Sequence, residues 1–161
     1  MRRKDREVIS INEIVQIIDK CDVCRVAFSD NDIPYIVPMN FGYHFSDEGL
    51  VLYFHCAREG KKLDIINKNA NVCFEMDCSH SLVTGNLACD YTMEYESVIG
   101  NGRICFITDQ MEKLNTLNFI MRKYSNNNEI KNNGFKYNDK HVKNVTCLKL
   151  MAMEFSGKRL K

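Results

Sequence analysis

The densest group of residues that could do chemistry runs from His55 to Lys62, in the order His-Cys-Ala-Arg-Glu-Gly-Lys-Lys. The apolar run Leu50–His55 predicts a strand that ends here, and a short helix is predicted to begin at Gly60. Amides at a helix N-terminus carry partial positive charge, glycine lets the backbone approach an anion, and Lys61 and Lys62 add full charges. This pattern is typical of a phosphate site. The alternative is a solvated basic turn.

A second candidate is the strand-like run Pro34–Tyr43, which contains Pro34 and Pro38. Each proline removes a ladder donor, so a central strand tolerates these residues poorly. One interpretation is an edge strand shielded by proline. In the other, a flat heteroaromatic ligand binds the exposed backbone amides and carbonyls, with Met39 and Phe41 as apolar contacts.

His55 differs from the other histidines because it directly precedes the Gly-Lys-Lys turn. There it could donate a proton or hold an anionic ligand, and the alternative is a partly buried histidine bonded to a backbone carbonyl. Cys21 and Cys24 have the CxxC spacing of redox pairs and half zinc sites, but no second CxxC or histidine pair follows. The eight cysteines are therefore interpreted as free, mostly buried thiols, and no metal site is predicted.

Composition narrows the class of protein. The 161 residues match one domain, 1–161, with one core. Lys+Arg and Asp+Glu nearly balance at 22 and 21, which argues against nucleic acid as the main partner. No apolar run reaches the length of a membrane helix, and the polar start is unlike a signal peptide. We expect a soluble cytoplasmic protein without membrane association.

The hydrophobic periodicity predicts the elements that position these residues. A capping-box pattern at Ser10–Glu13 precedes an amphipathic helix to Lys20, and Thr108 and Asp109 are candidate caps of a second long helix. The apolar stripe of that helix is interpreted as core packing: Met111, Leu114, Leu117, Ile120, Met121 and Tyr124. Asn126–Gly134 is predicted to be a polar loop. Strands are expected at Cys24–Ser29, Ile33–His44, Leu50–His55, Val72–Asp77, Tyr95–Ile107 and Val145–Phe155, with a short helix at Gly60–Asn67. An antiparallel barrel in an α+β chain follows.

Several ordered blocks resemble the nitroimidazole-resistance (Nim) related branch of the pyridoxamine 5'-phosphate oxidase-like flavoproteins, over about Arg6 to Lys158. The blocks are Asp5–Val8, Pro34–Tyr43, Tyr53–Lys62, Asn71–Glu75, Tyr95–Arg103 and Glu154–Lys158. The resemblance implies a mainly β, six-stranded antiparallel split β-barrel with flanking helices. It also implies a homodimer with FMN at the subunit interface, each cofactor touched by both chains.

Carried over residue by residue, the resemblance implies that Gly60, Lys61 and Lys62 hold the flavin phosphate and that Phe54 and His55 lead into this turn. His55 also matches a family histidine beside the flavin that is implicated in binding or reducing the ligand, so it is the candidate catalytic residue. The remaining cofactor-binding positions border the ring or lie near it: Val37, Pro38, Met39, Asn40, Ser97 and Val98.

The resemblance predicts an FMN-dependent oxidoreductase that acts on a small, nitroaromatic-like acceptor. Pyridoxamine-phosphate oxidases close with a segment containing arginine and tryptophan, whereas this chain has no Trp and ends at Ser156–Lys161. This departure argues against pyridoxamine-phosphate oxidation. The alternatives are a non-enzymatic flavin-binding protein, FAD in place of FMN, and a heme-binding barrel with His55 or another histidine as axial ligand.

Overall fold

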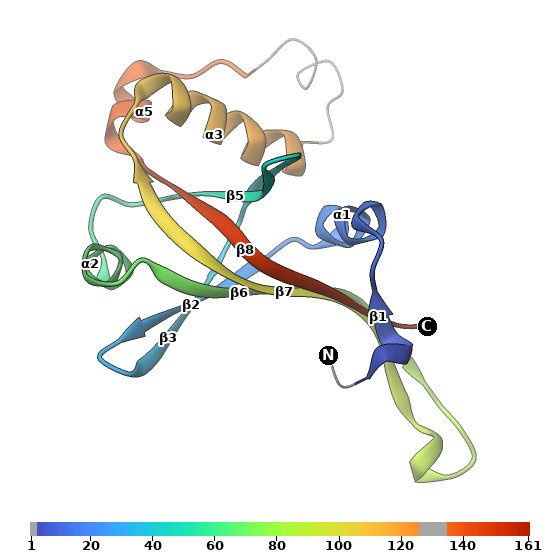
Figure 1. Ribbon diagram of the computed structural model, residues 1–161. Helices are drawn as coiled ribbons and strands as arrows, with labels where there is room; N and C mark the ends of the chain where they lie inside the picture. Colours follow the sequence, from blue (N-terminus) through green and yellow to red (C-terminus); the bar gives the residue numbers. More distant parts are fainter. Residues whose placement is uncertain (1–2, 126–134) are drawn as a thin grey trace.

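A strongly curved antiparallel sheet forms the centre of the computed structural model, which describes residues 3–125 and 135–161 (Figure 1). Its strands are β1 Glu7–Val8, β2 Cys24–Asp30, β3 Ile33–Met39, β4 Gly42–Ser46, β5 Gly49–Cys56, β6 Asn71–Val83, β7 Thr92–Ile107 and β8 Thr146–Leu160. The helices are α1 Ile11–Lys20, α2 Lys61–Lys68, α3 Gln110–Tyr124 and α5 Asp139–Asn144, with 3-10 turns at Lys4–Arg6 and Ala88–Asp90. Among the described residues, no helix is long and apolar enough to cross a membrane. The predicted loop Asn126–Gly134 lies outside the described residues.

The sheet has the strand order β3-β2-β6-β7-β8-β5-β4, with β1 paired to β8. The strand predicted over Ile33–His44 is divided into β3 and β4, which lie at opposite edges and are joined directly through Asn40 and Phe41. Counting β3 and β4 as one bent strand, and leaving the two-residue β1 aside, gives six strands. The predicted α+β split-barrel class is confirmed.

The bend between β3 and β4 has a packing cause. The Phe41 side chain is fully buried, and its amide donates to the hydroxyl of Tyr124 on α3 (3.0 Å) rather than to a strand. A Cβ at Gly42 would meet the α3 backbone at Phe119 and Ile120 within 2.5 Å, so only glycine lets helix and strand approach this closely. The break in the predicted strand therefore accommodates α3.

Alternation along the strands separates an inner apolar face from an outer face. On β5, for example, Leu52 and Phe54 are fully buried while His55 is exposed. The predicted amphipathic helix is α1, and it closes one side of the inner core with the buried side chains of Ile14, Ile17 and Ile18. The predicted side-chain cap at Ser10 is wrong. Only the Ser10 carbonyl takes part, by accepting a hydrogen bond from the Ile14 amide (3.0 Å).

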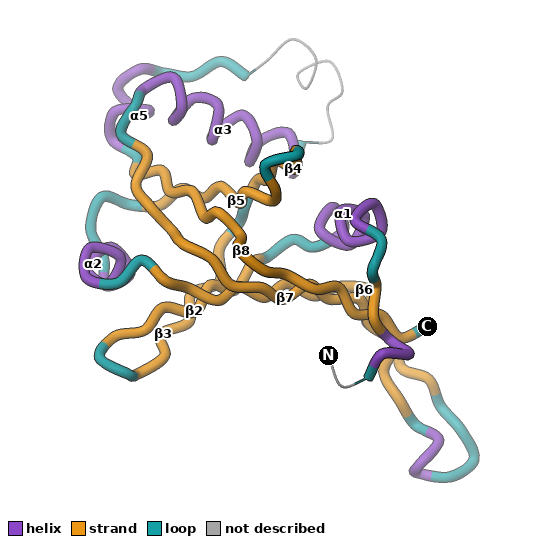
Figure 2. Tube along the Cα trace, viewed as in Figure 1, coloured by secondary structure: helices purple, strands orange, loops and turns teal. Residues whose placement is uncertain are grey.

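Helices α3 and α5 cover the end of the sheet where β5, β7 and β8 meet (Figure 2). Several buried residues of these elements lie outside the main core cluster: Ile107, Thr116, Ile120, Val142 and Cys147. The interpretation of the whole α3 stripe as core is wrong at Met111 and Met121, which are 65% and 41% exposed. The helix turns only a narrow face to the sheet, so an apolar stripe wider than that face reaches solvent.

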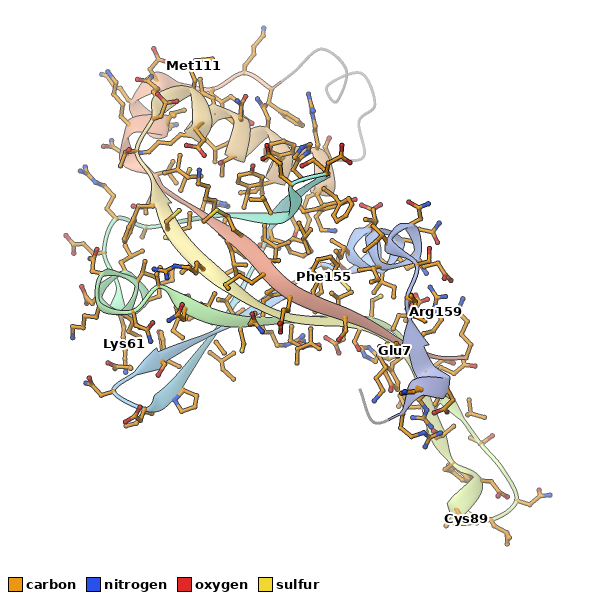
Figure 3. The ribbon with its side chains drawn as sticks, viewed as in Figure 1. Glu7, Lys61, Cys89, Met111, Phe155 and Arg159 are labelled. Atoms are coloured by element: carbon orange, nitrogen blue, oxygen red, sulfur yellow. The ribbon has the colours of Figure 1, made fainter. Side chains whose placement is uncertain are left out.

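Strands β6 and β7 are longer than predicted and continue into a hairpin that projects from the body, with Cys89 near its tip (Figure 3). The pairing register shifts between Cys78 and Ser81, and Ser79 has a positive φ of 59°. The hairpin residues 81–93 are exposed on both faces. Their sequence therefore lacks the alternation that marks a half-buried strand.

Candidate functional site

The predicted phosphate segment is a strand–turn–helix connection from the end of β5 to the start of α2. Gly60 is the N-cap of α2 with φ 144°, a backbone conformation that side chains rarely permit, and open space surrounds the position of its missing Cβ. The Leu63 amide donates to the Gly60 carbonyl (2.9 Å), which leaves the amides of Lys61 and Lys62 ahead of the first bonded turn. Buried Leu63 and Ile66 anchor the helix on the core. The connection thus presents a rigid, glycine-opened helix start.

The two lysines of this turn differ in their surroundings. Lys61 Nζ lies 3.1 Å from Asp30 Oδ2 and 4.9 Å from the centre of the Tyr35 ring. Lys62 makes no ion pair with any described residue. Burial raises the pKa of the neighbouring Cys56 thiol, and the charge of Lys62 opposes that rise. Lys62 is therefore the lysine whose charge is free for an anion, while Lys61 is held by the β2–β3 hairpin.

The contact of Lys61 with the β2–β3 hairpin was not identified from the sequence. Asp30 and Ile33 flank a two-residue turn at Asn31 and Asp32, both with positive φ, as in a type I′ turn, and Tyr35 lies two residues further along β3. The turn itself was predictable, but its contact with Lys61 depends on the tertiary packing of α2 on β2.

His55 lies on the outer face at the end of β5 and is exposed. Its register partner on β8 is Cys147, which is fully buried under α3 and α5, and burial raises the pKa of that thiol to about 11. Phe54, one residue earlier, points into the core. Of these two predicted residues, His55 therefore offers a side chain to a ligand, and Phe54 offers only its backbone.

The bend that follows β3 leads the chain to this part of β5. Gly42 pairs with Tyr53. Asn40 lies two residues before Gly42, and His55 lies two residues after Tyr53. The structure thus brings Asn40 and His55 to the same end of the sheet. The Asn40 side chain donates to the Asp22 carbonyl (3.2 Å).

The other predicted β3 residues alternate in orientation. Val37 and Met39 turn towards the core, and Met39 is only 8% exposed. Pro38 is exposed and pairs in register with Arg25. Met39 is therefore positioned to contact a ligand through its backbone, and its side chain stabilises the barrel.

Tyr124 is a site residue that sequence reasoning missed, because its spacing placed it in an apolar stripe. Its hydroxyl donates to the Asp22 carbonyl (2.7 Å) and accepts the Phe41 amide (3.0 Å). Burial raises the pKa of this hydroxyl, so it stays protonated. Tyr124 thereby fixes the β3–β4 bend that carries Asn40.

Ser97 and Val98 do not join the other predicted residues within one chain. Val98 is fully buried, and Ser97 pairs with Asp77 and Lys158. Cys105 pairs with Lys149 on β8, and Lys149 pairs with Tyr53 on β5, so Cys105 marks the part of β7 that lies level with the end of β5. Ser97 lies eight residues before Cys105, which is about 26 Å at 3.3 Å per residue. Figure 3 shows Lys61 and Arg159, which lies next to Lys158, at opposite sides of the molecule.

Comparisons with known proteins agree with this architecture. The pyridoxamine 5'-phosphate oxidase family model matches residues 10–159. The chain belongs to this family. It is 36% identical to a candidate 5-nitroimidazole antibiotic resistance protein from Bacteroides thetaiotaomicron, over 95% of this chain and 86% of that one, with a TM-score of 0.80. This relative is from the nitroimidazole-resistance branch of the family.

Two more distant structures share the fold. A flavocytochrome from Azotobacter vinelandii is 18% identical, with a TM-score of 0.81 over 100% of this chain and 72% of that one. An FAD- and heme-binding protein from Mycobacterium smegmatis is 15% identical, with a TM-score of 0.82 over 97% and 74% of the two chains. No curated protein sequence matched this chain.

Proposed function

We propose that this protein binds a flavin, FMN in the first instance, and uses it to transfer electrons to a small acceptor of the nitroaromatic class. The observation that carries the proposal is the helix start at Gly60–Lys62, with its open glycine and the unpaired charge of Lys62, in a chain 36% identical to a candidate nitroimidazole resistance protein. A helix start of this kind suits the terminal phosphate of a flavin nucleotide.

The residues of the turn have separate tasks in this proposal. The amides of Lys61 and Lys62 donate to the phosphate, and Lys62 supplies the neutralising charge. Asp30 and Tyr35 hold Lys61 in place, so Lys61 supports the turn and adds charge at longer range. The fit is chemical as well as geometric, because an anion is the ligand that such a donor set prefers.

A flavin ring would lie against the bend between β3 and β4. There the backbone of Val37 to Asn40 supplies polar groups, Tyr124 fixes the bend, and His55 stands at the same end of the sheet. When bound, the flavin supplies the two-electron chemistry. His55 is exposed and can hold a proton for the acceptor or bind an anionic group of it.

The proposal includes a homodimer that completes the site. Apolar side chains on the outer face of the sheet are well exposed, including Ile36 (59%) and Ile99 (54%). Ile99 helps to line a hollow of about 360 Å³, together with Cys73 and Ser156 among others. Exposed apolar surface of this kind is typical of an interface. The Ser97–Val98 segment, which is remote from Lys62 in its own chain, would then serve the site of the second copy.

Flavin titration of the phosphate-turn variants tests the proposal. The Lys61→Ala/Lys62→Ala variant should bind FMN roughly 10- to 100-fold more weakly, as expected for the loss of charged hydrogen bonds worth about 1.5–3 kcal/mol. The single Lys62→Ala change should account for most of this loss, and Lys61→Ala for less. Lys68→Ala, an exposed lysine at the far end of α2, is the matched control and should bind FMN like the wild type. Wild-type affinity in the double variant would refute the phosphate assignment.

A further inference from the structure

Two cysteines far apart in the sequence meet at the C-terminal end of α1. Cys21 directly follows the helix, and its amide donates to the Ile17 carbonyl (3.2 Å). The Cys78 thiol on β6 donates to the same carbonyl oxygen at 3.9 Å. One oxygen atom thus joins the Cys78 sulfur to the backbone of Cys21.

The side chains are neighbours as well. Burial raises the pKa of the Cys21 thiol, and the Cys78 thiol, through its charge and a hydrogen bond, raises it further. Cys24, the other cysteine of the CxxC pattern, makes no such contact. It is buried on β2, and the pKa of its thiol is raised by burial and by Glu75. The structure therefore pairs Cys21 with Cys78 rather than with Cys24.

The local backbone on the β6 side is irregular. The β6–β7 pairing shifts between Cys78 and Ser81, and Ser79 has a positive φ. A disulfide requires Cα atoms within about 7 Å and a defined S–S dihedral, so small backbone movements usually accompany its formation. Cys78 is the last β6 residue before this register shift, so such a movement falls at the end of the continuous part of the ladder.

We propose that Cys21 and Cys78 are a redox modification site that forms an intramolecular disulfide when the protein meets a hydroperoxide. This inference does not depend on flavin binding. The crosslink would fix the end of α1 to the β6 bulge. It lies next to Asp22, whose carbonyl accepts hydrogen bonds from Asn40 and Tyr124.

The accessibility of the two thiols sets the order in which they react. Cys78 is half-buried and Cys21 is fully buried, so the hydroperoxide reaches Cys78 first. The Cys78 thiol gives up its proton as the sulfur attacks one peroxide oxygen; the O–O bond breaks, and the leaving hydroxide (or alkoxide) takes up that proton, so that a sulfenic acid and water (or an alcohol) form. The Cys21 thiol then loses its proton as it attacks the sulfenic sulfur, the S–O bond breaks, and the departing hydroxide takes up that proton and leaves as water. The charge of Lys123 partly offsets the rise in the pKa of the Cys21 thiol that burial and Cys78 cause.

The test uses full-length protein in which exposed Cys73 and Cys89 are replaced by serine. Cys78 is then the sole cysteine between Lys68 and Arg103. After treatment with hydrogen peroxide and tryptic digestion without reductant, mass spectrometry should find peptide 21–25 joined to peptide 69–103. Fragment ions should place the bond on Cys21.

Control variants keep the outcome decisive. Cys78→Ser should abolish the crosslinked peptide, and Cys24→Ser should retain it. Should Cys24→Ser not fold, the fragment ions of the parent protein still separate Cys21 from Cys24. A bond to Cys24, sulfinic acid at Cys78 with Cys21 still reduced, or a complete lack of crosslink would each overturn the proposal.

Discussion

Glu96 on β7 is the group whose replacement the structure makes most informative for stability. It is 1% exposed and accepts hydrogen bonds from Lys20 Nζ (2.6 Å), Arg159 Nε (2.6 Å) and Ser79 Oγ (3.0 Å). These bonds tie α1, the β6 bulge and the end of β8 to one carboxylate. Glu96→Gln keeps the shape of the side chain and removes its charge. Arg159 retains its other ion pair, with Glu13 (2.7 Å).

The magnitude follows from the acid–base equilibrium of Glu96. Burial raises its pKa, but the hydrogen bonds from Lys20, Ser79 and Arg159 outweigh burial and lower the pKa from 4.5 to about 2. At about 1.4 kcal/mol for each tenfold change in proton affinity, this gap corresponds to about 3 kcal/mol of unfolding free energy. Because Lys20 is half exposed and solvent screens its charge, we expect about 2 kcal/mol.

The sign of the pH dependence is fixed by the same two values. The folded-state pKa is below the unfolded one, so the stabilisation is fully present above pH 4.5 and is lost as the pH falls towards 2. Wild type should therefore exceed Glu96→Gln at pH 7 and approach it near pH 2 to 3.

Urea unfolding followed by circular dichroism, at one protein concentration and several pH values, measures this difference. At neutral pH the variant should also melt about 5 °C lower. Glu94→Gln, on the same strand and without an ion pair to any described residue, is the control and should change little. A wild-type advantage that stays constant from pH 7 to pH 3 would refute the reasoning.

Two further predictions concern α3 and β5. Thr116 is fully buried and, among the residues described, nothing bonds its hydroxyl, so Thr116→Val should raise the unfolding free energy by about 1 kcal/mol in the same urea assay; a less stable variant would contradict this. His55→Ala should keep its flavin and should reduce a nitroaromatic acceptor with NADH roughly 100-fold more slowly than wild type, because the variant lacks a proton donor. An unchanged rate would show that His55 is not the proton donor. If even the wild-type flavin is not reduced by nicotinamides anaerobically, the protein binds flavin without this activity.

Much of the fold could be predicted because the local patterns are strong. The apolar spacing of Ile14, Ile17 and Ile18 on α1 and the alternation along β5 are consequences of one-sided burial. The helix start after Gly60 was also predictable, because a glycine and two lysines mark it in the sequence itself.

The rest depends on contacts between distant segments. Nothing in the spacing of Asp30 and Lys61 indicates that they form an ion pair, and nothing in the CxxC pattern indicates that Cys21 meets Cys78. The division of the β3–β4 run depends on Tyr124, whose apolar neighbours in the stripe concealed the polar role of its hydroxyl. Ser97 illustrates another limit, because its proposed role in the site depends on a second copy of the chain.

The absorption spectrum of the protein as purified, followed by chromatography of the ligand released on denaturation, tests the central claim most directly. We predict the two visible bands of an oxidised flavin and release of FMN. One distant neighbour is an FAD- and heme-binding protein, so the spectrum also decides between these ligands. A Soret band without flavin bands, or a colourless protein that does not take up added FMN or FAD, would contradict the proposed function.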